Sequence, residues 1–562
     1  MASKLSSFLA ELKRRKVYHV AAVYAAVGAA ISIAIPDLFG AFGFPEWAAP
    51  LVIVIIVIGF PVALVLAWAY EVRPETPREA EPTAPLITDS PVSEQRKSIV
   101  VLPFDNMSPD SGDAYFSDGL TEEIITHLSH VRSLRVISRN SAMALKGTQK
   151  STRAIAEELG VQFVLEGSVR KAGNDLRITA QLIDAPKDMH LWAEKYTGTF
   201  DDVFEIQETV ARSIVDALKI EVTSEEEERI ADRPIEDLTA YESYLKAKAG
   251  IYQFTEENVS EAIRHLHLAL DAVGDNATLY SGLALAHFSL MNLGVEIEEN
   301  RARAQDAVQK ALALDPDMPK ARAVLGLLIM AYRGTLEDVK RAARHLQRAL
   351  EADPDDVQAL WGMCVVYMYV GRPQAAYPLA KHLRETDPLD AYALWPLPAI
   401  LLLDGKYDMA LREFRRLHEE DPEHLTWLVW YALALAYREE VDDAVALIEA
   451  SARENPNDAP TKLALIQIRG FQGDNGGVLT ELNGPFYEWF RERFWAARVA
   501  AAFALLDERE EALDWLEHAV DQGLINYPWL SKGDLWLENI RGEERFRELM
   551  VRVKHDWETF EI

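Results

Sequence analysis

The sequence predicts a multidomain fold class: two transmembrane helices, then an α/β domain, then an all-α solenoid of paired helices. Three observations lead to this prediction. Two long apolar runs lie within the first 75 residues, residues 163–185 alternate apolar and polar residues around a Gly-Asn centre, and prolines recur every 34 residues from Pro354 to Pro456. These patterns are typical of membrane spans, a β-hairpin and repeated helix pairs, respectively.

The predicted membrane anchor covers residues 1–73. Residues 17–35 and 51–70 contain no Asp, Glu, Lys or Arg, and each is about 30 Å long as a helix, enough to cross a bilayer. The basic run Lys13-Arg14-Arg15-Lys16 precedes the first, while the segment between them has two acids and no Lys or Arg. Because basic flanks stay in the cytoplasm, we expect a two-pass hairpin in contact with membrane lipid, with cytoplasmic C-terminal domains. In the alternative, the first run is an interfacial helix or signal sequence, leaving a single crossing and periplasmic domains.

Residues 74–97 are rich in Pro, Glu, Ser and Thr and are expected to form a flexible linker. The α/β domain follows over residues 98–222. In its predicted hairpin, Leu176, Ile178 and Leu182 fall on one side of a period of two, which indicates a half-buried strand. Gly173 and Asn174 tolerate the positive φ of a tight turn. We also expect strands in SIVVLPF, LRVIS and MHLWAEKYTG, and helices in SDGLTEEIITHLSHV, STRAIAEELG and residues 202–222.

Five segments of this domain carry a family resemblance: SIVVLPFDNMSPD, YFSDGLTEEIITHLS, VISRNSAMALKG, AIAEELGVQFVLEGSVRKAGNDLRITAQLIDA and HLWAEKYTGTFDDVFEIQETVA. They are similar to the TolB amino-terminal-like domain of bacterial multidomain proteins, which often lies between a membrane segment and a tetratricopeptide array. The resemblance implies a bacterial inner-membrane protein and a module without established catalysis, so it transfers no catalytic residue. In relatives an adenylate cyclase, kinase or DNA-binding domain precedes the membrane segment. We expect this chain to be a version without such an effector domain.

One polar cluster in this domain allows two interpretations. Asp118, Glu122 and Glu123, together with Arg139 and Asn140, could form a metal or phosphate site. Alternatively, Asp118 caps a helix and the two glutamates favour its positive end, with Arg139 available for an ion pair. Capping explains the acids without requiring distant residues to converge, so we favour it.

Repeats dominate the sequence from residue 238 to residue 526. The segments ALALDP, ALEADP, RETDP, HEEDP and RENP place prolines at spacings of 38, 34, 34 and 34 residues, and 34 is the period of the tetratricopeptide family. Such helix pairs stack into a solenoid with an open inner face. We expect units at residues 239–273, 277–318, 319–356, 357–390, 391–424, 425–458 and 493–526. Residues 459–492 are degenerate in this pattern, and residues 527–562 are expected to form a helical cap.

In the tetratricopeptide family, the first helix of each unit lines the groove, chiefly at its second, fifth, ninth and twelfth positions. The resemblance therefore implies partner-binding residues in two units: Gln358, Trp361, Val365 and Met368, then Tyr392, Trp395, Ala399 and Leu402. Trp361 and Trp395 could anchor a peptide, or they could pack against the adjacent repeat. Pro396 and Pro398 inside a first helix predict a bend in that unit.

The composition narrows the function. A formal net charge of -31 argues against a nucleic-acid partner, and no phosphate loop, HExxH or CxxC motif is found, so we expect no cofactor, no metal and no enzyme activity. We predict a scaffold that binds a protein or peptide through the repeat groove. The alternative is a sensor whose TolB-like domain binds a small molecule and whose solenoid relays the signal. The sequence also leaves open whether the protein forms a homo-oligomer.

Overall fold

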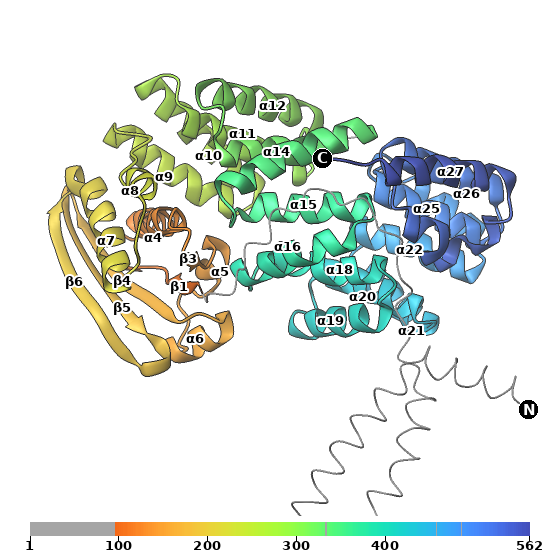
Figure 1. Cartoon of the computed structure of the whole chain (residues 1–562), viewed down its shortest axis with the longest axis horizontal. Helices are drawn as coiled ribbons and strands as arrows, with labels where there is room; N and C mark the ends of the chain where they lie inside the picture. The colour runs from red at the N-terminus through yellow and green to blue at the C-terminus, as the bar shows by residue number, and fades with distance from the viewer. Residues whose placement is uncertain (1–95, 332–333, 457, 485) are drawn as a thin grey trace, which may run out of the picture. The chain divides into compact units, whose positions relative to one another are not determined.

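The structure is a computed structural model that describes residues 96–331, 334–456, 458–484 and 486–562. It has a small sheet domain near residues 97–200, followed by a mostly helical solenoid (Figure 1). The predicted fold class, with two transmembrane helices, is corrected accordingly. In these ranges no helix is both long and apolar enough to cross a membrane, because even the 18-residue helices α10 (Glu256–Val273) and α12 (Ile297–Leu314) carry many charged residues. The apolar runs at 17–35 and 51–70 lie outside the described residues, and the inner-membrane location stays a prediction.

The sheet is mixed and has the strand order β3-β1-β4-β5-β6, with β2 pairing with β4. Its strands are β1 Lys97–Val101, β2 Asp105–Asn106, β3 Leu134–Val136, β4 Phe163–Ala172, β5 Asp175–Asp184 and β6 Met189–Thr199. β1 pairs in parallel with β3 and β4, whereas β4, β5 and β6 are antiparallel. The predicted hairpin is confirmed: β4 and β5 are joined at Gly173, whose φ of 63° suits a tight turn.

Helices α4 and α7 cover one face of the strands (Figure 1). The helices of this domain are α4 Ala114–Ser129, α5 Arg139–Ala144, α6 Thr152–Leu159, α7 Val203–Ala217 and α8 Ser224–Ile230. Ile178 and Leu182 of β5 are fully buried, whereas Arg177 and Thr179 lie on the solvent-exposed face of the sheet. The two-residue alternation in the sequence therefore identified the buried face correctly.

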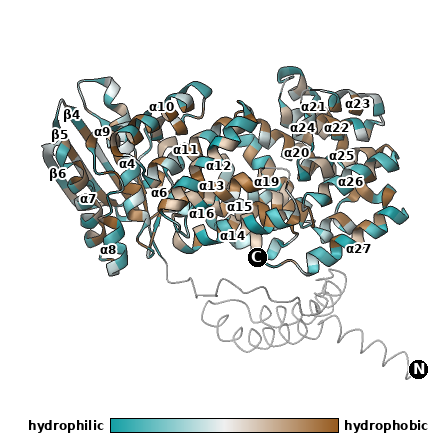
Figure 2. Cartoon of the chain, turned by 90° about the horizontal axis from the view of Figure 1, so that it is seen from above, coloured by the Kyte–Doolittle hydropathy of each residue, from teal (hydrophilic) through white to brown (hydrophobic). Residues whose placement is uncertain are grey.

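The solenoid consists of helix pairs that follow the predicted units. The pairs are α9 Leu238–Tyr252 with α10, α11 Ala277–Asn292 with α12, α13 Pro319–Met330 with α14 Leu336–Ala352, α15 Val357–Tyr369 with α16 Pro373–Thr386, α17 Ala391–Leu394 and α18 Pro396–Leu403 with α19 Tyr407–Glu420, α20 Leu425–Tyr437 with α21 Val441–Glu454, α22 Ala459–Gln472 with α23 Asn475–Leu482, and α25 Arg493–Leu505 with α26 Arg509–Asp521. Hydrophobic and hydrophilic residues alternate along many of these helices (Figure 2), as helices that bury one face require.

Two features refine the predicted units. Residues 459–492, degenerate in sequence, still form the pair α22 and α23, followed by the short helix α24 Tyr487–Phe490. The predicted bend is confirmed, because the first helix of the fifth unit is divided into α17 and α18 just before Pro396. A proline nitrogen cannot donate the helical hydrogen bond, so the hydrogen-bond ladder is interrupted at Pro396 although Trp395 keeps the helical dihedral angles φ -67° and ψ -41°.

The predicted cap is a more irregular segment than expected. After α26 the chain forms a π-helical turn at Trp529–Gly533, a 3-10 helix at Leu535–Ile540 and the final helix α27 Glu544–Glu558. We call residues 524–540 the return segment, because it passes back along the ends of earlier inner helices. Trp529, Leu530 and Leu537 within it are almost fully buried.

Candidate partner-binding surface

Aromatic side chains on several inner helices form a continuous row of ring contacts. The ring centroid of Trp361 on α15 lies 6.2 Å from that of Trp395, which lies 5.4 Å from that of Trp430 on α20. Tyr392 lies 6.0 Å beyond Trp361, and Trp495 on α25 lies 6.4 Å beyond Trp430. Aromatic pairs attract each other at such separations and at tilted or edge-to-face angles. We call this row the aromatic band, consisting of Trp361, Tyr392, Trp395, Trp430, Trp489 and Trp495.

The aromatic band is buried in its middle and accessible at its ends. Trp430 is only 3% exposed, whereas Tyr392 is 59% and Trp489 38% exposed. Trp361 and Trp395 are half-buried, so each packs against the adjacent repeat while keeping an accessible face. The indole N–H groups of Trp361 and Trp395 find no hydrogen-bond acceptor within the described residues. The band therefore combines a rigid base with an exposed aromatic edge at Tyr392.

Several residues expected in the groove are corrected by the structure. Val365, Met368 and Leu402 are at most 4% exposed, and Ala399 is fully buried. They belong to the hydrophobic core because neighbouring inner helices close over their positions. Only Gln358, half-buried one turn before Trp361, joins the accessible group with Trp361, Tyr392 and Trp395.

The return segment explains why the C-terminal ends of the inner helices are covered. The Asn526 side chain donates a hydrogen bond to the Met368 carbonyl at 2.9 Å, and the Ile525 N–H donates to Tyr369 at 3.0 Å. The Tyr407 hydroxyl donates to the carbonyl of Gly533 at 2.6 Å. Sequence reasoning missed this contact. The only signal was the density of aromatic and aliphatic residues in YPWLSKGDLWL, too many for an exposed terminal cap.

A buried ion pair fixes the return segment to the repeats. Asp534 is fully buried and pairs with the guanidinium of Arg498 on α25. The hydroxyl of Tyr437, at the end of α20, donates to Asp534 at 3.0 Å. Because a buried charge without its partner is costly, this contact holds the segment against the solenoid.

The predicted polar cluster lies where the sheet domain meets the first repeat. Glu122 of α4 lies 3.0 Å from Arg139 and 2.8 Å from Lys248 of α9, which is also 2.8 Å from Glu123. The Arg139 guanidinium stacks 3.7 Å from the ring centre of Tyr252. Burial alone would raise the pKa of Glu122, but the charges of Lys248 and Arg139 outweigh it and hold the pKa below its usual range. The carboxylates of Glu122 and Glu123 are thus neutralised by Arg139 and Lys248. These pairs stabilise the contact between the sheet domain and the first repeat.

Two residues of that cluster lie elsewhere, and the capping prediction is wrong. Helix α4 begins at Ala114, so Asp118 lies in its second turn and forms an ion pair with Lys146 at 2.6 Å. Asn140 donates to Asp390 of the solenoid at 3.1 Å. Among the residues that the structure describes, no three His, Cys, Asp or Glu side chains gather as a metal site would require.

A second contact joins the sheet domain to the turn between α16 and α17. The Ser141 hydroxyl and backbone N–H both donate to the Asp387 carboxylate, at 2.5 and 3.1 Å. Asp387 is fully buried. Burial, together with the nearby carboxylate of Asp390, raises the pKa of Asp387 to about 6. These are two of the places where the sheet domain contacts the solenoid, and an ion pair between Arg96 and Asp355 at 3.0 Å is another. The aromatic edge at Tyr392 lies a few residues beyond Asp387.

Two family models match parts of the chain. Residues 95–213 match the model described as HilA/YgeH-like transcriptional regulator, second domain. Residues 400–459 match the model described as tetratricopeptide repeat. Together with the helix pairs described above, this match confirms the predicted tetratricopeptide repeats. The model that matches the sheet domain is the HilA/YgeH-like one.

Known proteins resemble segments of the chain. A protein of Rhizobium meliloti (strain 1021), named "Putative adenylate cyclase 3", is 39% identical over 265 residues, which are 46% of this chain and 44% of that protein. A tetratricopeptide repeat protein from Parabacteroides merdae is 16% identical, with a TM-score of 0.32 over 50% of this chain and 99% of that chain. TolB from Acinetobacter baumannii is 20% identical, with a TM-score of 0.18 over 22% of this chain and 29% of that chain. Both TM-scores are too low to support an argument.

Proposed function

We propose that this chain is a scaffold that binds a protein or peptide partner at the exposed end of the aromatic band. The tetratricopeptide repeats support a role in protein–protein interaction. The observation that carries the specific proposal is Tyr392, which is 59% exposed although its ring is in edge contact with Trp361. A large aromatic side chain on a preformed, rigid base is the kind of residue that contributes most of the energy of an interface.

Polar groups beside the band provide the rest of the proposed surface. Gln358 lies one helical turn before Trp361, and its amide can both donate and accept hydrogen bonds. The Tyr392 hydroxyl lies at the end of an apolar ring, an arrangement enriched in interfaces. The proposed partner therefore presents an apolar or aromatic side chain flanked by hydrogen-bonding groups, such as those of a peptide backbone.

The sheet domain is proposed to act as a rigid support for the repeats. Two of its contacts with the solenoid, through Glu122 and through Asp387, bury charged groups. We propose that this domain is a TolB amino-terminal-like module, on the basis of the sequence segments of residues 98–222 quoted above.

The proposed surface can be mapped by photo-crosslinking. Peptides selected from a random display library on the full chain serve as defined partners, and p-benzoylphenylalanine replaces Tyr392 as the crosslinker. Crosslinking at this position, and none when the same group replaces Val551 (71% exposed, on α27), is the expected result. Equal crosslinking at both positions, or at Val551 alone, would reject the surface.

The proposal includes no catalytic step, whereas the name of the Rhizobium relative refers to an adenylate cyclase. The shared segment covers less than half of that protein. Full-length protein purified to homogeneity is therefore expected to form no cyclic AMP from ATP in the presence of Mg²⁺ or Mn²⁺. Sustained cyclic AMP formation that copurifies with the chain would replace the scaffold proposal by an enzymatic one.

A further inference from the structure

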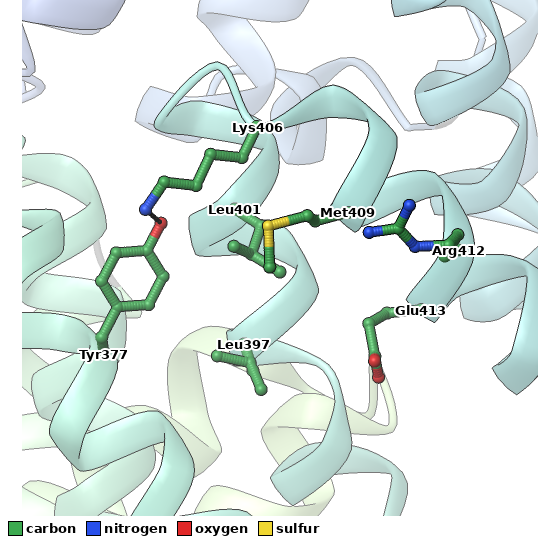
Figure 3. A pocket seen from close by; sticks show the side chains of 7 residues that line it. All are labelled: Tyr377, Leu397, Leu401, Lys406, Met409, Arg412 and Glu413. Atoms are coloured by element: carbon green, nitrogen blue, oxygen red, sulfur yellow. Dashed lines mark hydrogen bonds between the residues drawn. The ribbon is translucent and has the colours of Figure 1, made fainter. Parts of the chain in front are cut away.

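A hollow of about 320 Å³ opens between α16, α18 and α19, beside the proline-divided helix of the fifth repeat. It is lined by Tyr377, Leu397, Leu401, Lys406, Met409, Arg412 and Glu413 (Figure 3). None of these residues belongs to the aromatic band. The volume is at the small end of the range of ligand pockets, about 300 to 1,000 Å³.

The floor of the hollow is apolar. Leu401 is 5% exposed, whereas the Met409 side chain is 47% exposed although it lies against Leu397 and Leu401. The Tyr377 ring forms one wall, and its hydroxyl is engaged because it donates to Asp404 at 2.9 Å. Flexible thioethers adapt to irregular apolar ligands. The floor therefore suits a compact hydrocarbon body.

The charges around the hollow leave one cation uncompensated. Lys406 pairs with Asp404 at 3.0 Å, and Glu413 pairs with Arg384 at 3.0 Å. Arg412 is exposed and forms no ion pair with any residue in the described ranges. Its guanidinium points from α19 toward Met409 (Figure 3). Among the described residues, Arg412 therefore offers an exposed guanidinium beside an apolar hollow, and this local charge favours an anionic ligand.

We propose that this hollow binds a small organic acid. The apolar body of the acid lies against Leu397, Leu401 and Met409, and its carboxylate accepts hydrogen bonds from Arg412. A neutral compound would gain no charge-assisted hydrogen bond from Arg412. A cation would meet both Lys406 and Arg412. This site is separate from the partner-binding surface, so either proposal can fail without the other.

The first test compares an acid with its neutral analogue on the full chain. Ligand-observed NMR titration uses 3-phenylpropionate, hexanoate and 3-phenylpropanamide at neutral pH. At least one acid is expected to bind saturably, and the amide is expected to bind up to about five-fold more weakly, since an exposed ion pair contributes up to about 1 kcal/mol. Equal affinity for acid and amide, or no saturable binding of either acid, would overturn the proposal.

Variants locate the site. Arg412→Ala should weaken binding of the acid by up to about five-fold, and Met409→Glu should abolish it through charge repulsion. Arg415→Ala, an exposed arginine three residues along the same helix, is the matched control and should leave binding unchanged. Circular dichroism should show that all three variants are folded. Equal losses in Arg412→Ala and Arg415→Ala would contradict the site.

A peptide with a carboxyl-terminal Phe that binds ten-fold tighter than 3-phenylpropionate would identify a chain end, not a small acid, as the occupant.

Discussion

The two hydrophobic cores of the described chain are built in different ways. The first runs from Ile99 in the sheet to Leu328, so it combines the sheet domain with the first repeats. The second runs from Ala323 to Phe560 and contains the later repeats and the return segment. Helix α13 contributes one face to each core, with Ala321, Val324 and Leu328 on one side and Ala323, Leu327 and Met330 on the other.

The comparison teaches that one repeat period can serve two kinds of packing. In the first core, the contact between the sheet domain and the repeats is sealed by ion pairs around Glu122 and Lys248. In the second, the row of rings from Trp361 to Trp495 links four of the repeats and passes over the one formed by α22 and α23. The 34-residue period determines the positions of the helices. The residue types at the start of each inner helix determine which side chains are exposed on the surface of the repeats. The row of rings that ends at the exposed Tyr392 belongs to the second core.

The largest expected effect is at the buried ion pair of the second core. Asp534→Ala leaves the Arg498 guanidinium buried without its counter-charge, which should cost about 3 to 5 kcal/mol of unfolding free energy. Asp514→Ala, which removes an exposed partner of Arg545, should cost no more than about 1 kcal/mol. Urea denaturation followed by tryptophan fluorescence measures both. Similar midpoints for the two variants would mean that the return segment is not held as described.

The contact at Asp387 should make stability depend on pH. Its pKa is raised to about 6 in the folded chain, so between about pH 4 and 6 the folded state binds more protons than the unfolded state, and stability falls as pH rises. Asp387→Asn cannot titrate there. The unfolding free energy of this variant minus that of the parent should increase over this window by at most about 3 kcal/mol. A difference that is constant from pH 4 to 7 would show that Asp387 keeps an ordinary pKa.

An intermediate effect is expected at Trp361. Because it is half-buried, Trp361→Ala should destabilise the chain by about 1.5 to 2.5 kcal/mol. Trp430→Ala, at 3% exposure, should cost about 3 to 5 kcal/mol. Denaturation midpoints of the two variants compare the accessible and buried parts of the band directly. Equal losses would place Trp361 wholly in the core.

Much of the fold was predictable because local patterns carry it. Alternation around Gly173 identified the hairpin, the proline spacing identified the helix pairs, and Pro396 predicted the divided helix. The buried state of Val365 and Met368 was not predictable from the repeat register, since it depends on helices and on a return segment distant in sequence. The pairing of Glu122 with Lys248 likewise joins two residues that are 126 positions apart. Tyr392 and Trp361 were found because their repeat positions lie at the accessible start of the inner helix.

The affinity of a selected peptide for Tyr392→Ala tests the central claim most directly. Tyr392 is largely exposed, so its removal should change the unfolding free energy by no more than about 0.5 kcal/mol. Loss of an aromatic anchor should nevertheless weaken binding by about 2 kcal/mol or more, roughly 30-fold. Isothermal titration calorimetry on the full chain, with Val551→Ala as control, is expected to show this loss only for Tyr392→Ala. Unchanged affinity in a folded Tyr392→Ala protein would contradict partner binding at the aromatic band.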